Sequence, residues 1–307
     1  MDIVRGIAAL PLPGGPSAVT IGFFDGVHRG HQSVIGRTVE VARDRELRPV
    51  AVTFDRHPRE ILTPGTAPKV LTSLEGKAAL IEQLGIDTLV VLEFNEEFSK
   101  WPPERFVDDV LVAGLHVARV VVGANFTFGH KALGNIVSLN DFGAAGGFEV
   151  QGMGLLTLEG RRVSATSIRE ALSAGDLHWP EVALGRRYSV SGTVVRGAGR
   201  GASLGFPTAN LHVSPRILLP LDGVYAGLAN VDGRAHTAAI NVGTNPTFGQ
   251  EPLRAEAFLL DFEGDLLGRE MTMEFWIRLR DELRFGSADD LVEKIREDVD
   301  RTRALMG

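Results

Sequence analysis

GFFDGVHRGH, residues 22–31, stands between a short apolar run and a helical stripe, and this order decides the fold of the N-terminal half. The run before it, residues 18–21, is β-branched and bounded by turn residues, which predicts a buried strand. After it, side chains suited to a core recur with the period of an amphipathic helix, at Val34, Ile35, Thr38, Val41 and Ala42. Where a strand feeds a helix, unpaired backbone N–H groups and the helix dipole favour an anion. The stretch therefore predicts an anion-binding turn.

The rest of the N-terminal half alternates predicted strands and helices. Strands are expected at residues 50–54, 88–92 and 119–123, and helices at residues 74–84 and 104–113. All-apolar runs such as residues 89–92 fit strands buried on both faces of a parallel sheet. The alternation predicts a doubly wound, Rossmann-like α/β domain with its site at the C-terminal ends of the strands. Residues 143–147, rich in glycine, predict a flexible turn.

From about Tyr188 the pattern changes to short β segments. Strands are expected at residues 188–196, 224–231, 235–241, 255–261 and 271–279. Turn residues separate them, which predicts an antiparallel barrel or sandwich. A last helix is expected from Ser287, where S-A-D-D resembles a capping box, with Leu291, Ile295 and Val299 as its buried stripe. The predicted domains are residues 1–186 and 187–307.

Length, charge and composition narrow the class of protein. A chain of 307 residues exceeds the ~250–300 at which single cores stop growing, which also predicts two domains. The net charge of −7 argues against a nucleic-acid partner held by a basic surface. The absence of cysteine excludes disulfides and thiolate metal sites. No apolar run approaches the ~18 residues of a membrane span, so a cytoplasmic protein is expected. The oligomeric state stays open, a weak homo-oligomer included.

Three interpretations of His28-Arg29-Gly30-His31 compete. The first is a surface turn with incidental histidines. The second is a metal site with His57 as a third ligand, although no carboxylate-rich partner set is evident. The third is an H-x-G-H motif in which both imidazoles face a phosphate at the helix start and Gly30 lets the backbone approach. The strand, turn and helix around the motif favour the third interpretation.

Residues 161–177 hold a second cluster suited to phosphate. Hydroxyls and cations crowd one predicted helix start, at Arg161, Arg162, Ser164, Thr166 and Arg169. Such donors suit a triphosphate. The plainer interpretation is a capping box from Ser167 to Glu170 that starts a short helix ended by Gly175, and both can hold at once.

The second half offers a glycine-rich stretch and one isolated carboxylate. Residues 197–211, GAGRGASLGFPTANL, match neither a Walker A loop nor the dinucleotide fingerprint. Thr208 and Asn210 would point to one side of a strand, where hard oxygens can hold Mg²⁺ beside ATP phosphates. A glycine-rich hairpin with a polar face is the more common meaning of such a sequence. The alternation of residues 254–260 makes Glu256, taken alone, a solvated strand residue.

The order of the motifs resembles one known family. GFFDGVHRGH is followed by VTFDRHP (52–58), VVGANFTFG (121–129), the SATSIR helix start, LGFPTANL (204–211), LPLDGVYAG (219–227), AINVGTNPTFG (239–249) and RLRDELRF (278–285). Together they resemble the bacterial bifunctional riboflavin kinase/FMN adenylyltransferase (FAD synthetase) family over nearly the whole chain. The resemblance implies a nucleotidyltransferase domain and a riboflavin kinase barrel. It also implies two reactions: ATP phosphorylates riboflavin to FMN, and a second ATP gives FAD and pyrophosphate.

The resemblance also implies roles for individual residues. His28 and His31 would contact the ATP phosphates, Thr208 and Asn210 would bind Mg²⁺–ATP, and Glu256 would be the base for the riboflavin 5′-hydroxyl. The remaining ligand-binding positions would be Gly22, Phe24, Asp25, Gly30, His57, Asn125, Phe128, Ser164, Thr166, Arg169 and Gly205. Two departures from the family are Ala165, commonly a serine, and Leu267, near which a tyrosine is common.

Three rival functions are weighed against this one. An adenylyltransferase for another acceptor, with a merely regulatory β domain, is disfavoured by Glu256 and the Thr208/Asn210 pair. An RNA-binding or aminoacylation-like protein is disfavoured by the acidic charge and the missing lysine-rich signature. A non-catalytic flavin-binding protein would be excluded by turnover with ATP.

Overall fold

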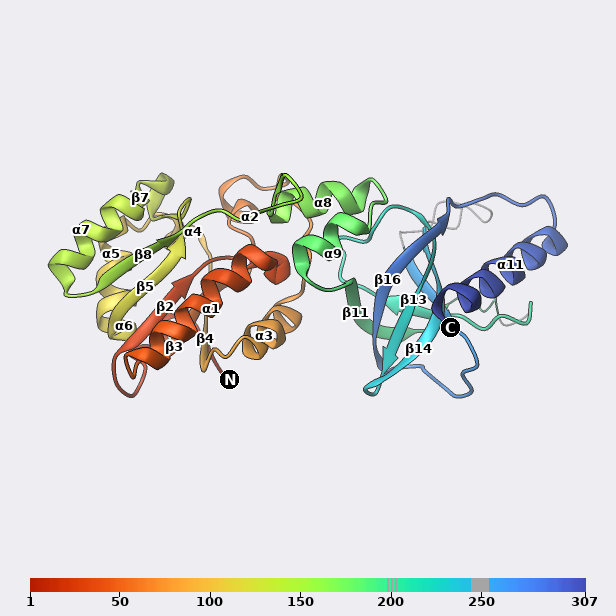
Figure 1. The fold of residues 1–307 in the computed structure, drawn as a ribbon, viewed down its shortest axis with the longest axis horizontal. Coiled ribbons are helices and arrows are strands. Elements are labelled where there is room, and N and C mark those ends of the chain that lie inside the picture. Colours follow the sequence, from red (N-terminus) through yellow and green to blue (C-terminus); the bar gives the residue numbers. More distant parts are fainter. Residues whose placement is uncertain (198, 200, 202–203, 244–253) are drawn as a thin grey trace. The chain divides into compact units, whose positions relative to one another are not determined.

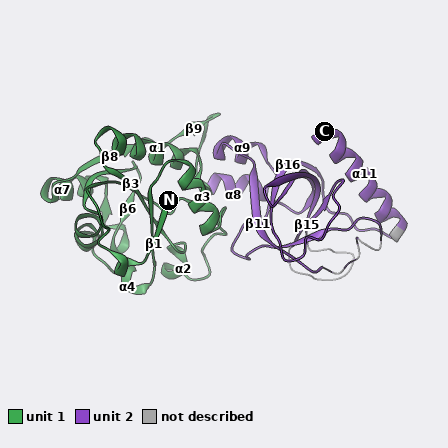
Figure 2. Cartoon of the chain, turned by 90° about the horizontal axis from the view of Figure 1, so that it is seen from below, with its two compact units in different colours: residues 1–165 green, residues 166–307 purple. Residues whose placement is uncertain are grey.

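The computed structural model describes residues 1–197, 199, 201, 204–243 and 254–307. They form two compact units, unit 1 (residues 1–165) and unit 2 (residues 166–307), coloured green and purple in Figure 2. Parts of two motifs, at 198, 200, 202–203 and 244–249, lie outside the described residues. Each unit is described by itself.

A six-stranded parallel sheet forms the middle of unit 1, in the order β1-β4-β3-β2-β5-β8 (Figure 1). Its strands are β1 (Asp2–Arg5), β2 (Ser17–Ile21), β3 (Arg48–Phe54), β4 (Thr88–Leu92), β5 (Val117–Gly123) and β8 (Glu149–Met153). Every residue of β2 and β4 is buried, as their apolar runs require. Two short hairpins accompany the sheet, β6 (Thr127–Phe128) with β7 (Gly134–Asn135) and β9 (Thr157–Leu158) with β10 (Arg161–Arg162). The predicted strands are confirmed, and the edge strands β1 and β8 add to them.

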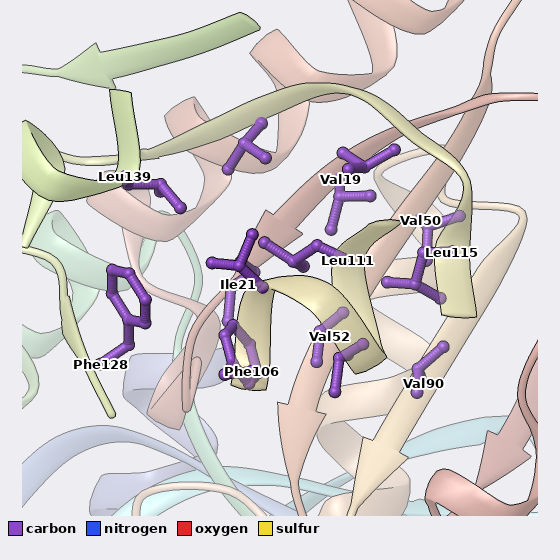
Figure 3. Packing of buried hydrophobic residues seen from close by; sticks show 14 of the residues in the cluster. Val19, Ile21, Val50, Val52, Val90, Phe106, Leu111, Leu115, Phe128 and Leu139 are labelled. Carbon is purple, nitrogen blue, oxygen red and sulfur yellow. The ribbon is translucent and has the colours of Figure 1, made fainter. Parts of the chain in front are cut away.

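Helices cover both faces of this sheet. They are α1 (Arg29–Asp44), α2 (Arg59–Leu62), α3 (Leu74–Gln83), α4 (Glu96–Ser99), α5 (Pro103–Arg105), α6 (Ala113–Leu115) and α7 (Ile136–Gly146), with a π-helical turn at Phe106–Val112. On one face, Ile35 of α1 and Ile81 of α3 pack with Leu89 of β4. On the other, Phe106 and Leu111 pack with the inward side chains of the central strands (Figure 3). The unit is therefore the three-layer α/β domain that the alternation predicted.

One local prediction in unit 1 is wrong, and one helix has an unexpected geometry. Residues 143–147 are not a free turn: Gly143 is buried inside α7, and only Gly147, at φ +75°, ends the helix. A Cβ on Gly143 would collide with the Phe148 carbonyl, so the glycine serves close packing. The helix expected at residues 104–113 is confirmed as a helical segment over residues 103–115, but its middle, Phe106–Val112, is π-helical.

Unit 2 is a closed six-stranded antiparallel barrel in the order β11-β12-β15-β14-β13-β16. Its strands are β11 (Tyr188–Val195), β12 (Ala209–His212), β13 (Gly223–Val231), β14 (Arg234–Gly243), β15 (Arg254–Leu259) and β16 (Glu270–Arg280). Its helices are α8 (Ala165–Ser173, which begins at the last residue of unit 1), α9 (His178–Leu184) and α11 (Ala288–Met306). Ser287 caps α11 by accepting from the Asp290 N–H at 3.1 Å, as predicted. The sequence left a barrel and a sandwich open, and the structure shows a closed barrel.

The capping box predicted at Ser167 is wrong. The helix already begins at Ala165, and Ser167 is buried, with its Oγ accepting from Trp179 Nε1 at 3.2 Å. Helices α8 and α9 precede residue 186 yet belong to unit 2 apart from Ala165, and the separable boundary near residue 186 stays a prediction. Among the described residues, no helix combines the length and apolar character needed to cross a membrane.

Candidate active sites

The turn after β2 is shaped by glycine and by left-handed backbone. A Cβ on Gly22 would lie 2.8 Å from the Phe24 ring. Any other residue at position 22 would therefore clash with this ring. Phe24, Gly26 and Val27 have φ angles of +52°, +73° and +39°. Positive φ is costly for a non-glycine residue, above all for β-branched Val27. The surrounding contacts must therefore hold this turn.

His28 and His31 lie together at the start of α1. Their rings stack with centroids 3.6 Å apart, and the His31 N–H donates to His28 Nδ1 at 3.3 Å. His28 Nδ1 is an acceptor, so the neutral ring carries its proton on Nε2. His31 is partly exposed, but its Nδ1 is buried and has no partner among the described residues. Burial, followed by the charges of His28 and Lys77, lowers the pKa of His31 well below its ordinary 6.5.

Asp25 and Lys77 lie behind the turn. The Asp25 carboxylate accepts from the Leu71 N–H at 2.8 Å and is 3% exposed, so the chain itself engages this predicted ligand position. Lys77 of α3 is equally buried and donates to the Phe23 carbonyl at 2.7 Å. No sequence motif pointed to Lys77; its place on the buried face of α3, between Leu74 and Ala78, is the signal that could have revealed it.

The ends of β3 and β5 bring further predicted residues to the same edge of the sheet. His57 meets the Phe23 ring edge-on at 5.0 Å, and its Nδ1 accepts from the Arg59 N–H at 3.1 Å. Asn125, after β5, is exposed. No group of three or more His, Cys, Asp or Glu side chains that could hold a metal occurs in the part of the chain described.

An aromatic cavity of about 480 Å³ opens at this edge. Its lining includes Phe54, Phe94, Phe98, Trp101, Phe106, Phe126 and Phe128. Phe128 stacks on Phe126 with centroids 5.5 Å apart. Trp101 is 7% exposed, and its indole N–H has no acceptor among the described residues. The cavity suits a flat, apolar ring system with acceptor atoms on its edge.

The residues of the second predicted phosphate cluster lie on both sides of the boundary between the units in the sequence. Ser164 precedes α8, Thr166 is exposed in its first turn, and Arg169 is partly buried in the second. Ser164 belongs to unit 1, whereas Thr166 and Arg169 belong to unit 2. Their convergence on His28 and His31 therefore stays a prediction.

In unit 2, the three residues predicted for phosphoryl transfer meet on neighbouring strands. Asn210 of β12 pairs with Glu256 of β15, and the Thr208 hydroxyl donates to Glu256 Oε2 at 3.3 Å. Asn210 is 8% exposed, and its Oδ1 has no partner among the described residues. Any Cβ on Gly197 would overlap the Asn210 amide, so this glycine makes room for it. Glu256 is therefore a partly buried, hydrogen-bonded carboxylate.

Two cavities of unit 2 share Thr208. One, of about 180 Å³, lies between the barrel and α11, and its lining includes Phe206, Glu256, Leu291, Ile295 and Val299. The other, of about 630 Å³, is lined by Arg196, Gly197, Thr208, Asp261, Glu263 and Asp265, among others. Leu267, half exposed, also lines the second cavity. Gly205 has a φ of +87° in the loop before Thr208.

A buried ion pair fastens α11 beside the smaller cavity. The Arg280 guanidinium of β16 binds Asp298 in a bidentate manner, with Nε–Oδ1 and Nη2–Oδ2 distances of 3.1 and 2.7 Å. Both residues line the cavity. No sequence motif pointed to this pair; the signal that could have revealed it is that Asp298 follows Ile295 by three residues on the buried stripe of the helix.

Comparisons with known proteins agree with this division. A family model described as FAD synthetase matches residues 14–167, and one described as riboflavin kinase matches residues 184–306. A bifunctional riboflavin kinase/FMN adenylyltransferase of Pseudomonas fluorescens is 39% identical, with 99% of this chain and 98% of the relative covered. Relatives of the same name from Listeria monocytogenes and Escherichia coli K12 are 38% and 33% identical, over 94% and 100% of this chain and 91% and 98% of their own lengths.

A solved structure from Streptococcus pneumoniae, titled as a macrolide-efflux protein, has a similar fold. The TM-score is 0.88 at 28% identity, with 99% of each chain covered.

Proposed function

The chain belongs to the bifunctional riboflavin kinase/FMN adenylyltransferase family, and on that premise we propose which residues run each of its two reactions. It is a transferase with both activities: it phosphorylates riboflavin with ATP and then converts FMN and ATP to FAD and pyrophosphate. We assign phosphorylation to unit 2 and adenylyl transfer to unit 1. The need for ATP in both steps supports a cytoplasmic location.

In unit 1, the FMN phosphate attacks the α-phosphorus of ATP, and pyrophosphate leaves. The aromatic cavity receives the flavin ring, and the free indole N–H of Trp101 supplies a donor for its edge. His28 and His31 contact the phosphates from the start of α1, where their rings stack on one another. Catalysis rests on positioning and on donors held where charge accumulates, because the FMN phosphate is itself the nucleophile.

In unit 2, the riboflavin ring enters the smaller cavity under α11 and ATP enters the larger one. Thr208 lines both cavities and bonds Glu256, and this shared position is the observation that carries the assignment. Glu256 accepts the proton of the riboflavin 5′-hydroxyl while the 5′-oxygen of riboflavin attacks the γ-phosphorus of ATP. ADP leaves from the opposite side.

The donor set beside Glu256 fits Mg²⁺. The buried Asn210 Oδ1 lacks a partner in the described part of the chain, and the hydroxyl of Thr208, just before β12, bonds the same Glu256 that pairs with Asn210. Both are hard oxygen donors of the kind that Mg²⁺ accepts together with substrate phosphates. When bound, the ion would neutralise charge on the ATP phosphates. Thr208 and Asn210 would hold it.

One incubation tests the proposed function. The purified chain is mixed with riboflavin, ATP and MgCl₂, and the flavins are separated by chromatography. FMN should appear first and FAD afterwards, and FMN supplied alone should yield FAD with release of pyrophosphate. Omission of MgCl₂ in the presence of a chelator should stop riboflavin phosphorylation. An absence of both products would refute the assignment.

A further inference from the structure

A buried lysine stands behind the histidine turn. Lys77 of α3 is 3% exposed, and its ammonium donates to the Phe23 carbonyl at 2.7 Å and to Thr53 Oγ1 at 3.1 Å. The ammonium also lies 4.3 Å from the centroid of the Phe23 ring. A buried cation is unfavourable unless its partners are held in good geometry. These contacts therefore tie α3, β3 and the turn together.

The lysine holds the turn next to its strained part. Phe23 directly precedes the left-handed Phe24, and its carbonyl accepts from both Lys77 and Thr53 Oγ1, the latter at 3.2 Å. On the far side of Phe24, Asp25 accepts from the Leu71 N–H at 2.8 Å. Left-handed residues of this kind persist only where their surroundings fix them. Residues 71–77 thus hold the turn at two points.

The charge of Lys77 also affects the pKa of His31. Burial lowers the pKa of Lys77 to about 8, against the opposing effect of the Asp25 and Asp55 carboxylates. The charged groups that act on Lys77 are Asp25 on the turn and Asp55 after β3. Those that act on His31 are His28 and Lys77 itself. Burial is the main cause that lowers the pKa of His31, and the charges of His28 and then of protonated Lys77 add to it. His31 therefore stays neutral near pH 7.

We propose that Lys77 is a positioning residue for adenylyl transfer, which fixes the turn of residues 23–27 and thereby the placement of His28 and His31 at the ATP phosphates. It does so from beneath the turn, without contact with substrate. The inference rests on the adenylyl transfer assigned to unit 1. It adds a residue of α3 to the parts on which that reaction depends.

The test compares Lys77→Met with Lys100→Met in the full chain. Methionine keeps the length of the side chain and removes its charge, and Lys100, whose side chain is 68% exposed, is the matched control in the same unit. Lys77→Met should lower kcat for FMN adenylylation about 10- to 100-fold, because small misplacements of reacting groups cost rates of this order. The dissociation constant for FMN should change by no more than about twofold. Lys100→Met should match the wild type.

The pH profile and the second reaction separate positioning from general damage. In Lys77→Met the acid limb of adenylylation should move to higher pH, because His31 loses a neighbouring positive charge and its pKa rises. Lys77→Arg, which keeps the charge, should leave that limb in place. Riboflavin phosphorylation by the same molecules should be unchanged, since it is assigned to unit 2.

Three results would overturn the proposal: wild-type kcat in Lys77→Met, an unmoved acid limb, or loss of FMN binding in step with kcat. If Lys77→Met does not fold, the Thr53→Val variant tests the proposal in its place. It removes one acceptor of the ammonium and should lower kcat several-fold, and an unchanged kcat would refute the idea. Failure of the assigned function is seen separately, because the wild-type chain would then make no FAD from FMN.

Discussion

The two histidines at the start of α1 differ in the environment of their ring nitrogens. His28 uses Nδ1 to accept from the backbone N–H of His31. His31 keeps a buried Nδ1 without a partner in the described part of the chain, and burial above all lowers its pKa well below 6.5. His31 is therefore neutral at pH 7, and its ring stacks on that of His28.

Replacing either histidine should stop FAD synthesis while sparing FMN synthesis. Loss of one preorganised donor at comparable sites costs about 10²–10³ in rate, and we expect this loss for His28→Ala and His31→Ala in the adenylylation of supplied FMN. Riboflavin phosphorylation, measured in the same tube, is the control. An equal loss of both activities would indicate a structural role, and tightly bound zinc that either substitution removes would indicate a metal site.

Glu256 is the residue whose local sequence was least informative. Its alternation with Ala255 and Ala257 predicts a solvated carboxylate, whereas the structure places it partly buried against Thr208 and opposite Asn210. The contact depends on the pairing of β12 with β15, which are 42 or more residues apart in sequence. A local pattern therefore cannot reveal it.

Glu256→Gln should lower riboflavin phosphorylation by ~10²–10⁴-fold, the usual contribution of a general base. Glutamine keeps the size and most hydrogen bonds, so riboflavin affinity should change little. Glu270→Gln, an exposed substitution on β16, is the matched control. Steady-state kinetics with riboflavin and with supplied FMN separate the two reactions. Near-normal FMN production would remove Glu256 from the mechanism.

At the scale of elements, the sequence predicts the helices and strands that have a local periodic pattern. It misses the elements that are defined by contacts between distant parts of the chain. Strand β4 has the predicted bounds, and α3 ends one residue early, because an all-apolar run and a capped amphipathic stripe are local signals. The edge strand β8, with the polar sequence EVQGM, has no such run and is defined by its pairing with β5. The π-helical turn at Phe106–Val112 likewise follows from how that segment packs on the sheet.

The ion pair between Arg280 and Asp298 should decide whether α11 stays on the barrel. Asp298→Ala takes the carboxylate from a partly buried guanidinium, which keeps its bond to the Asp281 carbonyl, and the cost should approach the ~3–5 kcal/mol of a broken buried pair. We expect faster amide exchange throughout α11 and a higher KM for riboflavin, with adenylylation of FMN unchanged. Asp300→Asn, exposed on the same helix, should match the wild type. Unchanged exchange and KM in Asp298→Ala would contradict this role.

At the scale of the whole molecule, each unit carries the residues that its assigned reaction needs, apart from Thr166 and Arg169 at the junction. The histidine turn and the aromatic cavity lie within unit 1, and both cavities around Thr208 lie within unit 2. The division into an α/β domain and a barrel was predictable from the change in periodicity near residue 188. The grouping of α8 and α9 with the barrel was not, because it rests on contacts such as the Leu221 N–H to Leu172 carbonyl bond of 2.9 Å.

We predict that a fragment of residues 187–307 converts riboflavin to FMN and stops there. It keeps Thr208, Asn210, Glu256 and the linings of both cavities. It lacks α8 and α9, and with them the Leu172–Leu221 bond and the buried Trp179. One hydrogen bond contributes about 1 kcal/mol, which corresponds to a melting shift of roughly 3–5 °C, between the values for smaller and larger domains.

A second fragment of residues 166–307 should therefore melt at least several degrees higher than residues 187–307, with the same rate of FMN formation. Calorimetry and flavin chromatography on both fragments give the two readouts. If either folded fragment makes FAD, or if FMN formation requires residues 1–165, the assignment of one reaction to each unit is wrong. If the two fragments melt together, α8 and α9 contribute nothing to the barrel, and the separable boundary lies near residue 186 as the sequence predicts.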